Sequence, residues 1–168
     1  MCIRDRLSCD LLNTLDLSGS EDLFKDPNVV TLFCAALRHS KVFRLLLDGC
    51  GIDDQALKFL AATLTGGCLM RALDIGWNPY TADGLTEFLR ILIFRFMSTG
   101  LTVLSTSIVT DEHRSLVEEF NILRRRLLPS YTELHIGCKN VLCSREKQRN
   151  SKKIFITRPQ FIARKPHH

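Results

Sequence analysis

The sequence lacks the features by which membrane proteins and many enzyme families are recognised. No apolar run approaches the roughly 20 residues that a membrane-spanning helix needs, and the best candidate, residues 91–97, is interrupted by Arg95. The chain has no Gly-x-x-x-x-Gly-Lys phosphate-binding loop, no nucleophile elbow and no visible signal peptide. We therefore expect no membrane span, no catalytic site and no cofactor.

Clustered metal ligands are also scarce. His135, Cys138 and Cys143 are the nearest approach to a zinc site, but three ligands at this spacing match no paired-ligand pattern. We interpret them as part of a structural strand end. The seven cysteines are expected to be reduced and mostly buried, in a cytoplasmic protein for which the nucleus is the alternative compartment.

One pattern is written twice between residues 42 and 92, with every position offset by 28 residues. The two copies read as follows: Val42-x-x-Leu45-x-Leu47-x-x-Cys50-x-Ile52 with Leu57, Leu60 and Leu64, then Met70-x-x-Leu73-x-Ile75-x-x-Asn78-x-Tyr80 with Leu85, Phe88 and Leu92. The alternation in the front half predicts a strand with one buried face, and the spacing of three and four in the back half predicts a helix. A lone strand–helix unit cannot bury its apolar face, so the copies should stack.

The ends of these units carry suitable polar residues. Asp53 and Thr81 occupy the same offset and are expected to cap the two helices. Cys50 and Asn78 follow the strands, where a small or hydrogen-bonding side chain can satisfy loop backbone groups.

The repeat resembles the leucine-rich repeat family, and its 28-residue spacing resembles the ribonuclease-inhibitor-like class. The resemblance covers about residues 11–136 and implies an α/β solenoid with a curved parallel sheet and helices on its convex side. It implies a binding scaffold rather than an enzyme. Related repeats occur in Ran GTPase-activating proteins, so part of a small-GTPase regulator is one alternative function.

Further copies extend the pattern on both sides. The sequence predicts strands near 12–17, 42–47, 70–75, 100–104 and 132–136, and helices near 27–38, 54–65, 82–95 and 111–128. In the fourth copy, Leu101 and Val103 match Leu73 and Ile75 at the same offset of 28. The longer fourth helix and the last short strand suit a C-terminal cap.

The two ends of the chain differ from the repeats. We interpret residues 1–10 as an artefact or a partial repeat, because the first six match a translation of the transposon end ATG TGT ATA AGA GAC AG. On that interpretation the chain is the C-terminal fragment of a longer protein and should self-associate at its N-terminal edge. The solenoid and cap then span 11–143. Residues 144–168 hold eight Lys or Arg against one Glu and are expected to be a disordered basic tail.

Matching strand positions should form rows on the concave face, and these rows are the candidate partner site. One row would contain Asp16, Leu46, Asp74 and Thr102, with Arg44 and Asp48 in flanking rows and Trp77 at a strand end. Trp is a common anchor at protein interfaces. The bland interpretation is that the aspartates only solvate the face and Trp77 packs on a loop.

The leading hypothesis is thus a scaffold that binds an unidentified protein on its concave face. The alternative is nucleic-acid binding or nuclear targeting through the tail, where Arg149, Lys152, Lys153 and Arg158 could neutralise phosphates.

Overall fold

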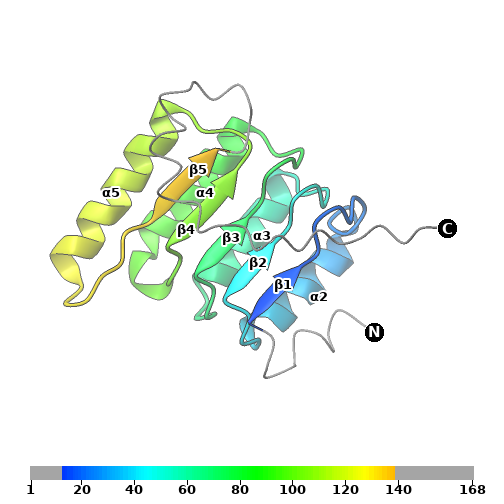
Figure 1. Ribbon diagram of the computed structural model, residues 1–168, viewed down its shortest axis with the longest axis horizontal. Coiled ribbons are helices and arrows are strands. Elements are labelled where there is room, and N and C mark those ends of the chain that lie inside the picture. The colour runs from blue at the N-terminus through cyan, green and yellow to red at the C-terminus, as the bar shows by residue number, and fades with distance from the viewer. Residues whose placement is uncertain (1–12, 139–168) are drawn as a thin grey trace.

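The computed structural model describes residues 13–138. Five parallel strands lie side by side in sequence order, as Figure 1 shows. The strands are β1 (Thr14–Asp16), β2 (Arg44–Leu46), β3 (Ala72–Asp74), β4 (Val103–Thr106) and β5 (His135–Cys138). The helices are α2 (Pro27–Arg38), α3 (Asp54–Leu64), α4 (Ala82–Phe94), the 3-10 helix η1 (Phe96–Ser98) and α5 (Asp111–Leu127).

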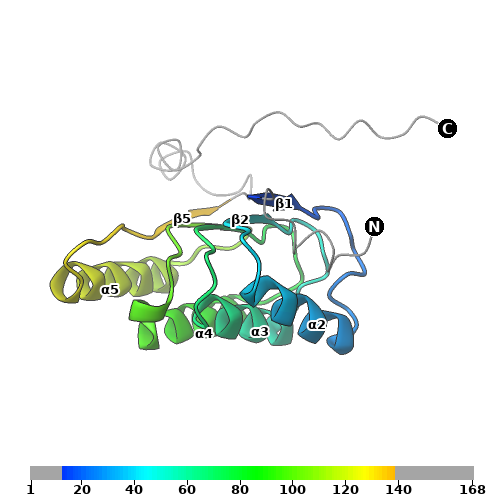
Figure 2. The same ribbon diagram turned by 90° about the horizontal axis from the view of Figure 1, so that it is seen from below.

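The helices lie on one side of the sheet, so the molecule has two layers and the other sheet face is open among the described residues (Figure 2). The α/β class and the five parallel strands are confirmed. The solenoid is not supported. The strands are also shorter than predicted, at three or four residues each.

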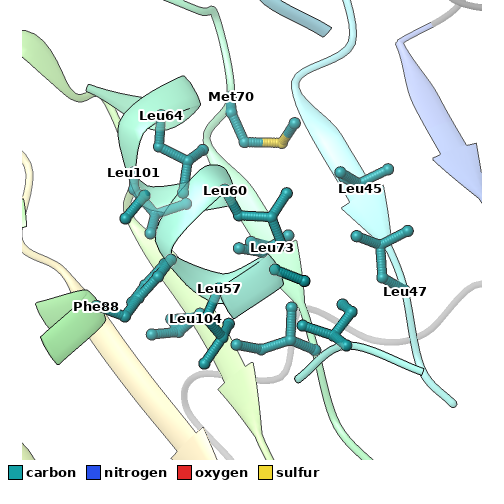
Figure 3. Packing of buried hydrophobic residues seen from close by; sticks show 14 of the residues in the cluster. Leu45, Leu47, Leu57, Leu60, Leu64, Met70, Leu73, Phe88, Leu101 and Leu104 are labelled. Carbon is teal, nitrogen blue, oxygen red and sulfur yellow. The ribbon is translucent and has the colours of Figure 1, made fainter. Parts of the chain in front are cut away.

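The core lies between the two layers. Leu45 and Leu73 point from the strands toward the helix side, where they meet the apolar faces of α3 and α4 (Figure 3). Leu73 is 2% exposed. The alternating and helical spacings in the sequence therefore identified the buried positions of the central units.

Helices α2, α3 and α4 each begin beside a residue whose side chain accepts a backbone N–H, as the sequence predicted for α3 and α4. The Asp26 carboxylate accepts the backbone N–H of Asn28, and Pro27 occupies the first turn, where its missing N–H costs nothing. Asp53 and Thr81 cap α3 and α4 in the same way, through the N–H groups of Ala56 and Gly84.

The fourth strand departs from the predicted register. Leu73 pairs with Leu104 and not with Leu101, so the offset between β3 and β4 is 31 residues. The connection from β3 to β4 is therefore three residues longer than the one from β2 to β3, and it contains η1 after α4. The predicted register was wrong because Leu101-x-Val103 also fits the strand pattern. In the structure, Leu101-x-x-Leu104 is the segment that aligns with Met70-x-x-Leu73.

Cys50 and Asn78, which follow β2 and β3, hydrogen-bond to loop backbone groups as predicted. The Asn78 side-chain oxygen accepts the N–H groups of Cys50 (2.8 Å) and Ile52 (3.1 Å). Its side-chain nitrogen donates to the carbonyls of Leu47, Ile75 and Gly76 at 2.9–3.0 Å. The Cys50 thiol donates to the Leu17 carbonyl at 3.1 Å. These two side chains tie three successive turns together.

The cysteines follow the prediction only in part. Cys34, Cys50 and Cys68 are free and buried, and burial raises the pKa of each thiol, for Cys50 to about 11. Cys138, at the end of β5, is disulfide-bonded. The expectation of reduced thiols is therefore wrong at that position.

Candidate protein-binding face

The open sheet face presents one side chain from every second strand residue. Because successive residues in a strand point to opposite faces, the neighbours of the buried leucines point away from the helices. The register gives a row at the strand starts, Thr14, Arg44, Ala72, Val103 and His135. A second row, two residues later, contains Asp16, Leu46, Asp74, Ser105 and Gly137.

A groove runs over β2, β3 and β4 on this face. Its floor is mainly apolar, with Leu46, Ala72 and Val103 each partly exposed. Phe43, 46% exposed, stands at the end where the strands begin. The groove therefore offers an accessible apolar strip where a partner could bury surface.

The two ends of the groove carry opposite charges. Arg44 and Arg71 line it where the strands begin, and Asp74 lines it where β3 ends. The Arg71 guanidinium donates to the Gly100 carbonyl at 3.0 Å, which holds the cation across the lip of the groove. A partner in this groove would meet positive charge at one end and negative charge at the other.

The structure brings together most of the predicted partner-binding residues. Asp16, Leu46 and Asp74 share one row, Arg44 lies in the row before it, and Asp48 lies two residues beyond Leu46. Asp16 is exposed, and the other four are partly exposed.

Thr102 is the exception. It lies before β4, where its hydroxyl donates to the Arg71 carbonyl at 3.1 Å, and Ser105 takes the place predicted for it in the row. The predicted position of Thr102 in this row is wrong, because the offset between β3 and β4 is 31 residues and not 28. Thr102 still lines the groove, at the strand-start end.

Sequence reasoning missed Phe43, Arg71, Val103 and Ser105. Phe43 and Arg71 are 28 residues apart and each directly precedes a strand. That equivalence was a usable signal. The other two depend on the register of β4.

Trp77 stands beyond the end of β3, three residues after Asp74, with 57% of its surface exposed. Its backbone has φ +54°, in the left-handed region. At the equivalent turns, Gly19 (φ +83°) and Gly49 (φ +60°) hold this conformation without a side-chain penalty. A bulky residue there costs about 1–3 kcal/mol, and such strain is concentrated at functional sites.

The Asn78 hydrogen bonds explain how the turn retains this conformation. They fix the carbonyls of Ile75 and Gly76, directly before the tryptophan. The surrounding turn thus holds a large, exposed indole at a position that is occupied by glycine in the two equivalent turns of this chain.

Other predicted features lie partly or wholly outside the described residues. The tail residues Arg149, Lys152, Lys153 and Arg158, and Cys143 of the zinc group, are among them. Within residues 13–138, no cluster of three His, Cys, Asp or Glu side chains is placed to hold a metal ion. Over the same residues, no helix combines the length and the apolar character needed to cross a bilayer.

Comparison with solved structures shows the fold. One match is the tropomodulin C-terminal domain from Caenorhabditis elegans, with a TM-score of 0.59 and 14% identity over 90% of this chain and 88% of that chain. Another is actin-binding site 2 of leiomodin-1, with a TM-score of 0.58 and 16% identity over 90% of this chain and 82% of that one. No family model and no curated protein sequence matches.

These findings correct the resemblance drawn from the repeat. The structural neighbours are a tropomodulin domain and a leiomodin site, so the assignment to the ribonuclease-inhibitor-like leucine-rich repeats is wrong. The small-GTPase alternative depended on that assignment and loses its basis with it.

Proposed function

We propose that this chain is a protein-binding module that receives its partner on the open face of the sheet. The groove over β2–β4 carries the proposal, because it combines an accessible apolar floor with opposite charges at its ends. Apolar burial would supply affinity, and the charges would fix the partner's orientation.

Trp77 supports the same face. Aromatic residues are enriched among the side chains that dominate interface energies. An exposed tryptophan in a strained turn offers a rigid anchor three residues beyond Asp74, which lines the acidic end of the groove.

Actin is the first partner to test, because the similar leiomodin-1 structure is named as an actin-binding site. Binding of the full chain to labelled actin monomers would be measured by fluorescence anisotropy and to filaments by co-sedimentation. We expect Leu46→Asp and Arg71→Glu each to weaken binding at least tenfold. The matched control is Arg126→Glu, which changes another exposed arginine, on α5 and away from the groove.

Trp77→Gly separates binding from folding. Glycine fits the left-handed turn, as at Gly19 and Gly49, so thermal stability should stay level or rise. Partner binding should fall at the same time. Binding that is equal for parent, Leu46→Asp, Arg71→Glu and Trp77→Gly would overturn the assignment of the open face, and absence of actin binding by the parent would exclude actin.

A further inference from the structure

A second hollow lies on the helix side of the molecule, at the C-terminal ends of the helices. Its lining includes Gly66 beyond the end of α3, Glu87, Ile91 and Phe94 of α4, the α4 C-cap residue Arg95, and Arg38 at the end of α2. None of these residues lines the groove on the sheet face. The two surfaces are therefore separate.

The hollow carries an exposed aromatic side chain at its rim. Phe94, the last residue of α4, has 83% of its surface exposed, and Met97 in the following turn η1 is 68% exposed. The connection from β3 to β4 is three residues longer than the one from β2 to β3, and it alone among the described connections contains a 3-10 turn. The extra length thus accompanies apolar side chains that point into solvent, which the core does not require.

Two arginines flank this aromatic without an acidic partner. Among the described residues, neither Arg38 nor Arg95 forms an ion pair, whereas Arg90 pairs with Glu112 at 3.2 Å. A Cβ placed on Gly66 would lie 3.3 Å from Arg38 Nε, so the glycine lets that side chain lie against the end of α3. The cations also meet the negative ends of α2 and α4, which accounts for their presence but not for the exposed phenylalanine beside them.

From this charge and shape we infer that the α3–α4 hollow is a second docking site, which takes an acidic segment of a partner protein bearing one large apolar side chain. The apolar side chain would enter the hollow against Phe94 and Ile91, and flanking carboxylates would pair with Arg38 and Arg95. A concave site bordered by Glu87 fits a protein segment better than an anionic bilayer, which favours a uniformly basic surface.

The inference can be tested with a displayed library of random 12-residue peptides, selected against the full chain. Enriched peptides should contain Asp or Glu within a few residues of Phe, Trp, Leu or Met. For a peptide of this kind, Phe94→Ser and the double variant Arg38→Glu/Arg95→Glu should each weaken binding at least tenfold. Arg126→Glu and Leu32→Ser are the controls, since they change an exposed arginine and a 71% exposed leucine outside the hollow.

Variants of the sheet face keep the two sites distinguishable. Leu46→Asp and Arg71→Glu should leave binding of these peptides unchanged, even if they abolish actin binding. Thermal melts confirm that each variant is folded. The inference is overturned if no acidic peptide is enriched, if the Phe94 and Arg38/Arg95 variants bind as the parent does, or if those variants instead abolish binding to vesicles of phosphatidylserine and phosphatidylcholine.

Discussion

The central and C-terminal helices are anchored to the sheet by different means. The inward faces of α3 and α4 are almost wholly apolar, with Leu57, Leu60, Leu64, Leu85, Phe88 and Leu92 at 0–1% exposure. In α5 the buried residues are His113, Val117, Phe120, Asn121 and Arg124, so three of five are polar. The difference shows that a helix in this fold can be fixed to the sheet either by apolar packing or by directed hydrogen bonds.

Arg124 is the centre of the polar anchoring. It is 3% exposed, and its guanidinium donates to the carbonyls of Leu101 (2.9 Å), Thr132 (2.8 Å) and Thr99 (2.6 Å). It also lies 4.2 Å from the centre of the Phe120 ring. Burial lowers the pKa of this arginine to about 10, with Arg71 contributing further. One side chain therefore joins α5 to the segments that precede β4 and β5.

Asn121 and His113 extend the same arrangement. The Asn121 amide exchanges two hydrogen bonds with the backbone of Leu134, at 2.7 and 2.9 Å. His113 Nδ1 accepts the N–H of Thr110, and Nε2, 2.9 Å from the carbonyl of Ala82, carries the ring hydrogen. Hydrogen bonds have fixed directions, so these contacts specify one placement of α5 where apolar packing alone would tolerate sliding.

The largest effect should come from removing the buried arginine. Arg124→Ala leaves three carbonyls without their charged donor, and each such bond contributes about 1.5–3 kcal/mol, so we expect a loss of at least about 4.5 kcal/mol in the free energy of unfolding. Urea denaturation measures it. Arg125→Ala, on the exposed side of the same helix, is the control and should change stability far less. If the two variants were equally stable, the polar anchoring of α5 would be disproved.

The apolar anchoring of the central units can be challenged in the same assay. Leu73→Ala opens a cavity between β3 and the helices and should cost about 2–5 kcal/mol. Asp74→Ala, the next residue on the opposite face, should change stability by less than about 1 kcal/mol. A urea midpoint for Leu73→Ala that matched the parent would show that the central core is not packed as described.

The stability of the protein at alkaline pH tests whether the Cys50 thiol is buried. The pKa of Cys50 is raised to about 11 in the folded state from an ordinary value of 9.0, because burial disfavours the thiolate. A raised folded pKa gives stability that is complete below about pH 9 and is lost as pH rises through 11. The loss amounts to at most about 2.7 kcal/mol, at 1.36 kcal/mol per pKa unit.

The matched variant for this effect is Cys50→Ser, which cannot ionise in this range. The free energy of unfolding would be measured from pH 8 to pH 11 for parent and variant. The parent should lose more stability than the variant across that window. Parallel curves for the two proteins would mean that the Cys50 thiol is not buried in the folded state.

The sequence predicted the central units well because several independent signals indicate the same structure there. Leu45 and Leu73 sit on a period of two, Leu57 and Leu60 on a helical period, and the caps Asp53 and Thr81 mark the helix starts. Local pattern and burial agree at all these positions, so few alternatives existed.

The C-terminal unit was harder to predict because polar residues do its packing. Neither Asn121 nor Arg124 signals burial in a hydrophobic pattern, and their partners are carbonyls that any sequence carries. The shift of β4 had a different cause, since Leu101 and Leu104 both satisfy the strand pattern and only the length of the preceding connection decides between them. The sequence singled out Trp77 as an aromatic residue at a strand end, but its left-handed backbone conformation is seen only in the structure.

The smallest expected effect on stability comes from removing residues 144–168. Apart from the disulfide of Cys138, the described hydrogen bonds that hold α5 and β5 are made among residues 82–138, so we expect an unchanged urea midpoint. Eight basic residues against one acidic residue should give the tail salt-sensitive affinity for nucleic acid, with Arg149, Lys152, Lys153 and Arg158 among the contacts. Retention of the intact and shortened chains on a random DNA duplex would be compared at several salt concentrations. Equal retention would exclude the tail as the electrostatic contact, and a lower urea midpoint for the shortened chain would show that the anchoring of α5 depends on residues beyond the described fold.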